Sequence, residues 1–179
     1  MKDRFEVVMA GSGGQGLIVS GIMLGEAAIL EGKNVAQTQS YGIATRGGFS
    51  KAEVIIDKEE IIFQQVEEPD IVLVLTEEAM DKFAQVKGIP VVYDTTLLRE
   101  RSEDNFYGFP FTRLATELGR AAAANMIALG AISALTGVVQ AESLAEVARR
   151  RFSAQAMDLN LQALQAGVNL VRKAAVRGE

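Results

Sequence analysis

A glycine-rich turn directly after a short apolar run is the feature that most constrains how this chain can fold. Residues 7–11 are apolar and short enough for a buried strand, and residues 14–31 form an almost wholly apolar stretch of helical length. The sequence GSGGQG at residues 11–16 joins them, and its glycines permit a tight turn. Gly32 follows the helical stretch, where a C-terminal glycine cap belongs. We therefore expect a strand, a glycine turn and a helix that packs against a sheet.

Strand-like and helix-like segments alternate along the first half of the chain, and helices dominate the second half. Further strands are predicted at residues 34–39, 52–56, 70–76 and 89–93, an exposed excursion at residues 94–110, and helices from residue 111 onward. Thr76 is expected to cap one helix, and Ser143 with Glu146 fits a capping box that starts a late one. This order predicts an α/β fold, a three-layer α/β/α sandwich that is Rossmann-like with a largely parallel or mixed central sheet. A length of 179 residues suits a single domain spanning residues 1–179.

The chain lacks the side chains on which thiol, imidazole and many metal chemistries depend. It contains no Cys and no His, so it has no thiolate nucleophile, imidazole base, disulfide, structural zinc site or cysteine-ligated iron–sulfur cluster. Its formal net charge of −5 repels phosphate backbones at long range, which argues against nucleic acid as a partner. Any redox cofactor that needs such ligands must therefore be held by another chain.

Two segments bear on the location of the protein. Residues 1–10 mix charged and apolar side chains and lack the long apolar stretch of a signal peptide. Residues 121–141 carry no formal charge and are long enough to span a bilayer, but they are rich in Ala and Gly and include several polar side chains. We therefore expect a cytoplasmic protein with a buried helix in this second segment and no membrane span.

The glycine turn matches the G-x-G-x-x-G pattern of dinucleotide-binding folds, yet its surroundings do not. Such a site places an Asp or Glu about 20 residues beyond the glycines to hold the ribose, whereas residues 36–40 read AQTQS. A P-loop is disfavoured too, because no GK[ST] is present and residues 7–25 carry no charge. Two interpretations stay open. The turn either approaches an anion, a polar cofactor or another protein's backbone, or it only connects strand and helix tightly without a ligand.

A second glycine-rich segment, SYGIATRGGFS at residues 40–50, has neither strand nor helix periodicity and is expected to form a loop. Arg46 is the only charged residue between Lys33 and Lys51. Its planar guanidinium suits two parallel hydrogen bonds to a carboxylate or phosphate, and an ion pair with a local carboxylate is the alternative. The residues alone leave both roles open.

Two later segments complete a recognisable pattern: PDIVLVL at residues 69–75 and LATELGRAAAANMIALGA at residues 114–131. Together with the two glycine-rich loops, they strongly resemble the gamma subunit of 2-oxoacid:ferredoxin oxidoreductases over nearly the whole chain. The length is also similar to that of a free-standing gamma subunit. The resemblance implies an accessory subunit of an enzyme that converts a 2-oxoacid, CoA and oxidised ferredoxin into acyl-CoA, CO2 and reduced ferredoxin.

The resemblance further implies where the cofactors and partners lie. Thiamine diphosphate with Mg²⁺ and the iron–sulfur clusters belong to other subunits in this family, so this chain would bind no cofactor alone. Its partners would be alpha, beta and delta subunits of the same enzyme, with ferredoxin and CoA reached through the complex and CoA near the interface. A 2-oxoglutarate enzyme is favoured. The alternatives are the small subunit of an indolepyruvate:ferredoxin oxidoreductase and a stand-alone nucleotide-binding module.

Position by position, the resemblance assigns ten residues to the binding of the cofactor or co-substrate and none to catalysis or metal binding. They are Gly13, Gly14, Gln15 and Gly16 in the first loop, and Tyr41, Gly42, Arg46, Gly47, Gly48 and Ser50 in the second. Both loops should lie near the carboxyl ends of the first two strands. Arg46 is expected to supply charge to a CoA phosphate or a partner carboxylate, and Asn125 to cap a helix or bond to a loop. The family often reads YGPE-S/A-RGG where this chain has residues 43–45 as Ile, Ala and Thr, and commonly has Gly-Asn at the position of Gly119 and Arg120.

Overall fold

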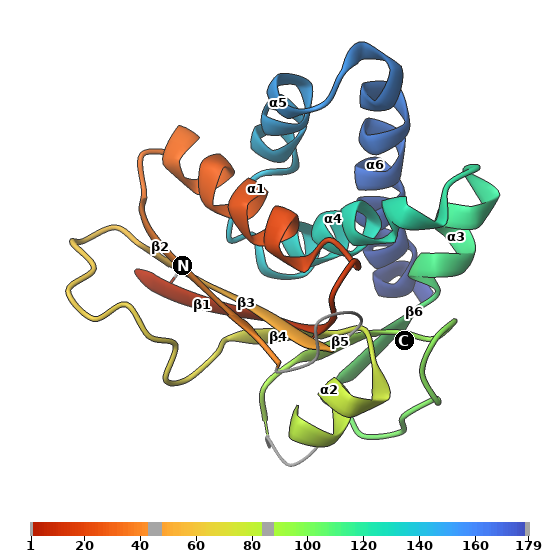
Figure 1. The fold of residues 1–179 in the computed structure, drawn as a ribbon, viewed down its shortest axis with the longest axis horizontal. Helices are drawn as coiled ribbons and strands as arrows, with labels where there is room; N and C mark the ends of the chain where they lie inside the picture. The colour runs from red at the N-terminus through yellow and green to blue at the C-terminus, as the bar shows by residue number, and fades with distance from the viewer. Residues whose placement is uncertain (1, 43–47, 84–87, 178–179) are drawn as a thin grey trace.

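A computed structural model describes residues 2–42, 48–83 and 88–177 and contains a six-stranded sheet with helices on both faces (Figure 1). The strands are β1 (Arg4–Ser12), β2 (Asn34–Tyr41), β3 (Phe49–Asp57), β4 (Ile71–Val74), β5 (Val91–Asp94) and β6 (Phe106–Phe109). The helices are α1 (Leu17–Leu30), α2 (Glu77–Phe83), α3 (Phe111–Glu117), the short 3-10 helix η1 (Ala121–Ala123), α4 (Ala124–Thr136), α5 (Ala141–Arg151) and α6 (Ala154–Arg177). The predicted α/β fold is confirmed.

The sheet is mixed, with the strand order β2-β3-β1-β4-β5-β6. Strands β1, β4, β5 and β6 run parallel to one another, whereas β3 is antiparallel to both of its neighbours, β1 and β2. Strand β2 therefore runs in the same direction as β1 but is separated from it by β3. As a result, the carboxyl ends of β1, β2 and β4 and the start of β3 share one edge of the sheet.

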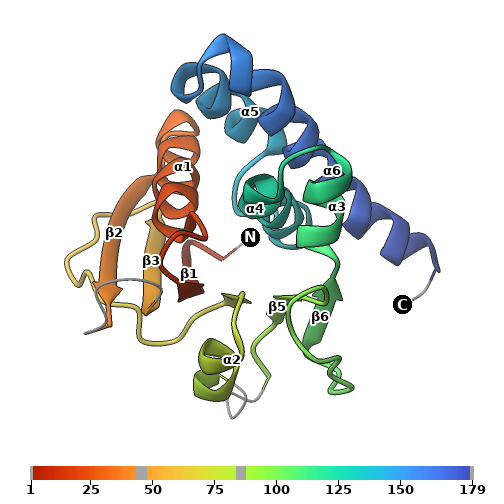
Figure 2. The same ribbon diagram turned by 45° about the vertical axis from the view of Figure 1, so that its right-hand side comes forward.

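The two faces of the sheet are covered unequally. Helices α1, α3, α4, α5 and α6 lie on one side, and α2 lies on the other (Figures 1 and 2). Strand β1 supplies both cores in alternation, because Val7 and Met9 belong to the large core under the helical layer while Val8 and Ala10 belong to the smaller core under α2. Burial on both faces explains why β1 reads as a continuous apolar run.

Helix α1 is closely packed and ends where the sequence predicts. Its cap, Gly32, has φ +76°, and the N–H of Lys33 donates to the carbonyl of Ala28 at 3.1 Å, as in a Schellman motif. On the sheet side of the helix, a Cβ built on Gly25 would lie 3.0 Å from Val35 Cγ1 of β2. The absence of a side chain at Gly25 therefore lets α1 approach the β2–β3 hairpin.

The apolar segment at residues 121–141 forms the buried helix α4 rather than a membrane span. Along the described ranges, no helix combines the length and apolar character needed to cross a bilayer. Helices α4 and α6 cross at the level of their backbones, since a Cβ on Gly130 would collide with the Leu164 carbonyl and one on Gly167 with the Ile127 carbonyl. These glycines set the closest approach of the two helices.

The predicted exposed excursion at residues 94–110 is largely exposed, but the prediction missed a strand within it. Residues 106–109 form β6, the edge strand, which pairs in parallel with β5. The Val91 N–H donates to the Asn105 carbonyl at 2.8 Å, and the Thr95 N–H donates to the Phe109 carbonyl at 3.0 Å. A strand of only four residues that includes a glycine and follows a charged stretch has too little periodicity to be recognised.

Of the two predicted helix starts, one is confirmed and one is wrong. Thr76 caps α2, its Oγ1 accepting a hydrogen bond from the Ala79 N–H at 3.2 Å. The capping box with Ser143 at its start is wrong, because α5 begins at Ala141 and its N-cap is Gln140, three residues before Ser143. There the Gln140 N–H donates at 2.6 Å to the carboxylate of Glu31, the C-cap of α1, so a residue distant in sequence bonds to the start of α5.

Candidate functional site

The two glycine-rich loops meet at the shared edge of the sheet. Strand β1 ends beside the start of β3, with Ser12 opposite Phe49. Just beyond, the Gly13 N–H donates to the Gly48 carbonyl at 3.0 Å and joins the first loop to the second. The Gly42 N–H donates to the Phe49 carbonyl at 2.6 Å, which closes the base of the second loop. The described parts of both loops therefore lie near the carboxyl ends of β1 and β2, as predicted.

Gln15 holds the first loop in shape. Its side-chain Oε1 accepts a hydrogen bond from the Ser12 N–H at 2.8 Å, and its Nε2 donates to the Leu75 carbonyl at 3.1 Å, directly after β4. Gly11 leaves room for this arrangement, because a Cβ there would collide with Gln15 Oε1. Both polar ends of Gln15 are thus bonded to backbone, and the side chain ties the loop to β1 and β4.

Two glycines of the first loop adopt backbone conformations that other residues resist. Gly14 has φ +92° and Gly16, the N-cap of α1, has φ +75°. No side chain caps α1, and its first turn contains no acidic residue, so the helix presents uncompensated N–H groups at this edge. Asn125 of α4 donates from Nδ2 to the Gly16 carbonyl at 3.4 Å. Asn125 therefore bonds to the loop, one of the two roles expected for it.

The second loop brings aromatic side chains to the same edge. Ser50 is buried and lies opposite Gly11 in the sheet, whereas Tyr41, its partner on β2, is 63% exposed. Next to them, the ammonium of Lys82 lies 3.4 Å from the centroid of the Phe49 ring. Lys82 could not be predicted as a neighbour of the loop, because α2 is far from the loop along the chain and carries no motif. Lys82 brings an ammonium group to the edge, where it also lies 3.5 Å from the carboxylate of Glu78.

Eight of the ten predicted residues are therefore gathered at one place, which we call the loop rim. They are Gly13, Gly14, Gln15, Gly16, Tyr41, Gly42, Gly48 and Ser50. Arg46 and Gly47, together with the departures from the family pattern at residues 43–45, lie outside the described residues.

The loop rim offers backbone N–H groups, with the ammonium of Lys82 beside it, rather than acid–base or metal chemistry. No group of three or more His, Cys, Asp or Glu in residues 2–42, 48–83 and 88–177 could hold a metal ion. With no Cys or His anywhere in the sequence, the chain does not fit an iron–sulfur cluster. The arrangement is suited to contacting an anion or another polypeptide.

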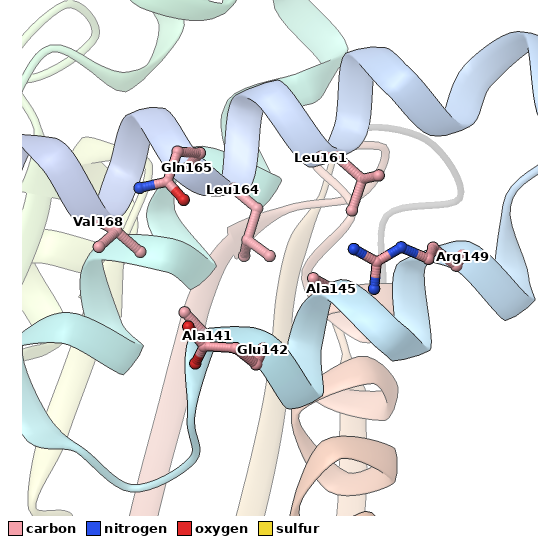
Figure 3. A pocket seen from close by; sticks show the side chains of 8 residues that line it. All are labelled: Ala141, Glu142, Ala145, Arg149, Leu161, Leu164, Gln165 and Val168. Atoms are coloured by element: carbon pink, nitrogen blue, oxygen red, sulfur yellow. The ribbon is translucent and has the colours of Figure 1, made fainter.

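A separate hollow lies between α5 and α6 (Figure 3) and has a volume of about 270 Å³. It is lined by Ala141, Glu142, Ala145, Arg149, Leu161, Leu164, Gln165 and Val168. All eight residues belong to the helical layer, and none belongs to the loop rim. The hollow is therefore distinct from the candidate site.

Comparison with known proteins identifies the family of the chain. Residues 6–170 match the family model described as pyruvate ferredoxin/flavodoxin oxidoreductase. The 2-oxoglutarate synthase subunit KorC of Archaeoglobus fulgidus is 40% identical over 176 residues, an alignment that covers 97% of this chain and 91% of that protein.

Solved structures with the same fold include one subunit of similar length and one much longer chain. The gamma subunit of a keto/oxoacid ferredoxin oxidoreductase from Geobacter sulfurreducens superposes with a TM-score of 0.82 at 37% identity, covering 95% of this chain and 99% of that one. The 2-oxoglutarate:ferredoxin oxidoreductase from Magnetococcus marinus, solved with 2-oxoglutarate, coenzyme A and succinyl-CoA bound, gives a TM-score of 0.87 at 26% identity. That match covers 97% of this chain but 32% of the longer one. The chain therefore belongs to the pyruvate ferredoxin/flavodoxin oxidoreductase family and is a gamma subunit of a 2-oxoacid:ferredoxin oxidoreductase.

Proposed function

We propose that this gamma subunit serves an enzyme of the 2-oxoglutarate type and that its loop rim completes the CoA side of a reaction chamber formed mainly by partner subunits. The observation that carries the proposal is the hydrogen bond from Gly13 to Gly48, which makes a single surface of the two loops. The preference for 2-oxoglutarate is supported by the 40% identity to a 2-oxoglutarate synthase subunit.

The chemistry of the loop rim suits the anionic part of CoA. The first N–H groups of α1 have no acceptor within the helix, and the helix dipole favours a negative charge beside them. Gly14 leaves open space, because a Cβ built there would meet no atom within 4 Å. Lys82 and Arg46 would supply positive charge, with Arg46 contacting a CoA phosphate or a carboxylate of a partner subunit at the junction.

The proposed division of labour follows from what the chain lacks. Alpha, beta and delta subunits would hold thiamine diphosphate with Mg²⁺ and the iron–sulfur clusters, which supply carbanion stabilisation and electron transfer. The residues of this chain would bind and orient CoA, exclude water from its side of the chamber and meet the partner subunits. Ferredoxin would be reached through the complex.

Purification of the tagged protein from its native cells tests the proposal. We expect it to co-purify with thiamine-binding and cluster-binding subunits, and the eluate to reduce a viologen dye when 2-oxoglutarate and CoA are both added. Pyruvate, 2-oxoisovalerate and indolepyruvate serve as competing substrates. A chain that is recovered alone and binds NAD or FAD tightly by calorimetry would refute the proposal, and a preference for indolepyruvate would correct the substrate.

The contribution of Arg46 is tested in the reconstituted enzyme. Loss of a charge-assisted hydrogen bond is worth about 1.5–3 kcal/mol, so Arg46→Ala should raise the apparent KM for CoA or lower turnover about 10-fold or more. The unfolding free energy should change by less than about 0.5 kcal/mol. Arg172→Ala, which removes an exposed arginine of α6, is the matched control and should leave the kinetics unchanged. Unaltered kinetics in Arg46→Ala would remove this residue from the site.

A further inference from the structure

The segment between β3 and β4, residues 58–70, exposes two adjacent large apolar side chains. We call it the β3–β4 loop; it extends from the sheet at the end of β1 opposite to the glycine-rich loops (Figure 1). Ile62 is 91% exposed, the highest value for a large apolar residue in the described part of the chain, and Phe63 is 50% exposed. Single exposed apolar residues are common on protein surfaces, but a pair on one loop is a candidate contact site.

The far half of the β3–β4 loop is fixed to the core. Glu6 of β1 is only 6% exposed, and its Oε2 accepts hydrogen bonds from the N–H groups of Glu67 at 3.0 Å and Glu68 at 3.2 Å. The other oxygen of Glu6 accepts from Arg4 Nε at 2.7 Å. Val66 packs against the smaller core beneath α2. A buried carboxylate on the central strand is thus committed to holding this loop in place.

The near half is fixed as well. Asn34 Nδ2 donates to the carbonyls of Lys58 at 3.1 Å and Glu59 at 3.0 Å. Arg4 Nη2 lies 3.4 Å from the carbonyl of Phe63, whose backbone it contacts while the ring stays half exposed. The loop is therefore bonded to the fold at its start, middle and end, and it still presents Ile62 and Phe63 outward. Such pre-ordering lowers the entropy lost on binding.

The exposed charge on the loop itself is mainly acidic, and the nearby Arg4 is paired with Glu6. Glu59, Glu60, Glu67 and Glu68 are exposed on the same loop. The only cation of the loop, Lys58, is paired with Asp3 at 2.7 Å. A complementary surface would place Lys or Arg around an apolar pocket. Two copies of the loop would repel each other, and an anionic membrane surface would repel the loop.

We propose that the β3–β4 loop docks this subunit on a partner subunit of the same enzyme, with Ile62 and Phe63 inserted into an apolar pocket rimmed by Lys or Arg. Two observations support this occupant: the acidic charge of the loop, and the longer Magnetococcus marinus chain, of which the matched region covers 32% and is continuous with the rest of that polypeptide. The inference rests on the subunit assignment. The experiment that tests it measures assembly of the complex rather than CoA kinetics. The inference can therefore fail while the proposed function holds.

The double variant Ile62→Ser/Phe63→Ser tests the apolar contact in the full-length chain. Titration against the purified partner subunits should show a dissociation constant at least 10-fold higher than that of the wild type, as expected for central apolar anchors. Val176→Ser on α6 removes a side chain that is 88% exposed and is the matched control. Both variants should keep the wild-type unfolding midpoint. When saturating concentrations restore the complex, the double variant should also keep the wild-type KM for CoA.

Charge reversal tests the cationic rim. Glu59→Lys/Glu60→Lys should weaken the association several-fold and flatten its dependence on salt, whereas Glu103→Lys/Asp104→Lys, on the exposed segment before β6, should change neither. Binding of the Ser double variant within two-fold of wild type would overturn the proposal. So would a dimer of the free chain that the double variant abolishes while the enzyme still assembles normally, because the loop would then contact a second copy.

Discussion

Substituting Gly16 by Ala tests two requirements at this position of the first loop: a left-handed backbone conformation and the absence of a side chain. Gly16 has φ +75°, a conformation that costs an L-residue about 1–2 kcal/mol. Its missing side chain also faces α4, where a Cβ would collide with the amide nitrogen of Asn125. Gly14 shares only the first demand, because it has φ +92° but a Cβ there would meet no atom within 4 Å. Gly14→Ala is therefore a built-in control for the conformational cost.

The expected magnitudes follow from these contacts. Gly14→Ala should lower the unfolding free energy by about 1–2 kcal/mol, the cost of the left-handed conformation alone. Gly16→Ala carries the same cost and must also displace Asn125, losing its hydrogen bond to the Gly16 carbonyl, worth about 0.5–1 kcal/mol, and straining its rotamer by about 1 kcal/mol. Gly16→Ala should therefore cost about 3 kcal/mol. In an Asn125→Ala background its cost should fall to that of Gly14→Ala.

The unfolding free energy of each variant is measured by urea denaturation of the isolated chain. Far-UV circular dichroism monitors the transition, because the sequence contains no Trp whose fluorescence could be used. The double-mutant cycle of Gly16→Ala with Asn125→Ala should give a coupling of about 1–2 kcal/mol. A coupling below about 0.5 kcal/mol, or equal costs for Gly14→Ala and Gly16→Ala, would show that α4 does not constrain the start of α1.

Two further predictions concern the helical layer. Gly167→Ala should destabilise the fold by about 2 kcal/mol in urea, because overpacking against the Ile127 carbonyl outweighs the helix-propensity gain of about 1 kcal/mol; a more stable variant would contradict the close crossing of α4 and α6. Burial raises the pKa of Glu31, but hydrogen bonds from Lys33 and the Gln140 N–H outweigh it, and the net pKa is lowered. The stability that this carboxylate contributes is therefore present above its unfolded-state pKa and lost as pH falls. In urea titrations between pH 7 and pH 3, Glu31→Gln should lose less stability than the wild type. Parallel pH profiles of the two proteins would contradict the assignment.

The first half of the fold could be predicted because its signals are local. The strand at the start of the chain, the glycine turn and the glycine cap of α1 depend on residues that are neighbours in sequence. The order of the strands could not be predicted, because nothing local says that β3 is inserted between β1 and β2. Likewise, the N-cap of α5, Gln140, is hydrogen-bonded to the carboxylate of Glu31 at the end of α1, which lies 109 positions away in the sequence. Long-range contacts of this kind leave no periodicity in the sequence.

The loop rim shows the same limit. Its glycines and Tyr41 could be named from their motifs, and their meeting at one edge follows from the rule that α/β sheets place such loops at strand ends. The motif gave no role to the side chain of Gln15, which is bonded to backbone at both ends and shapes the loop. Lys82 belongs to no motif and lies beside the rim only because α2 packs against β1 and β4 on the second face of the sheet.

Strand β1 connects the two surfaces that this subunit would use. Its amino end carries Arg4 and Glu6, which hold the β3–β4 loop, and its carboxyl end leads into Gly13 at the loop rim. Nine residues of strand span about 30 Å, and β1 is paired with β3 along this whole length and with β4 over Val7–Ala10, which makes it a rigid element. Docking through Ile62 and Phe63 at one end would therefore fix where the glycine-rich loops lie at the other. A partner subunit bound to the β3–β4 loop would therefore help to position the loop rim on the CoA side of the chamber without contacting the rim.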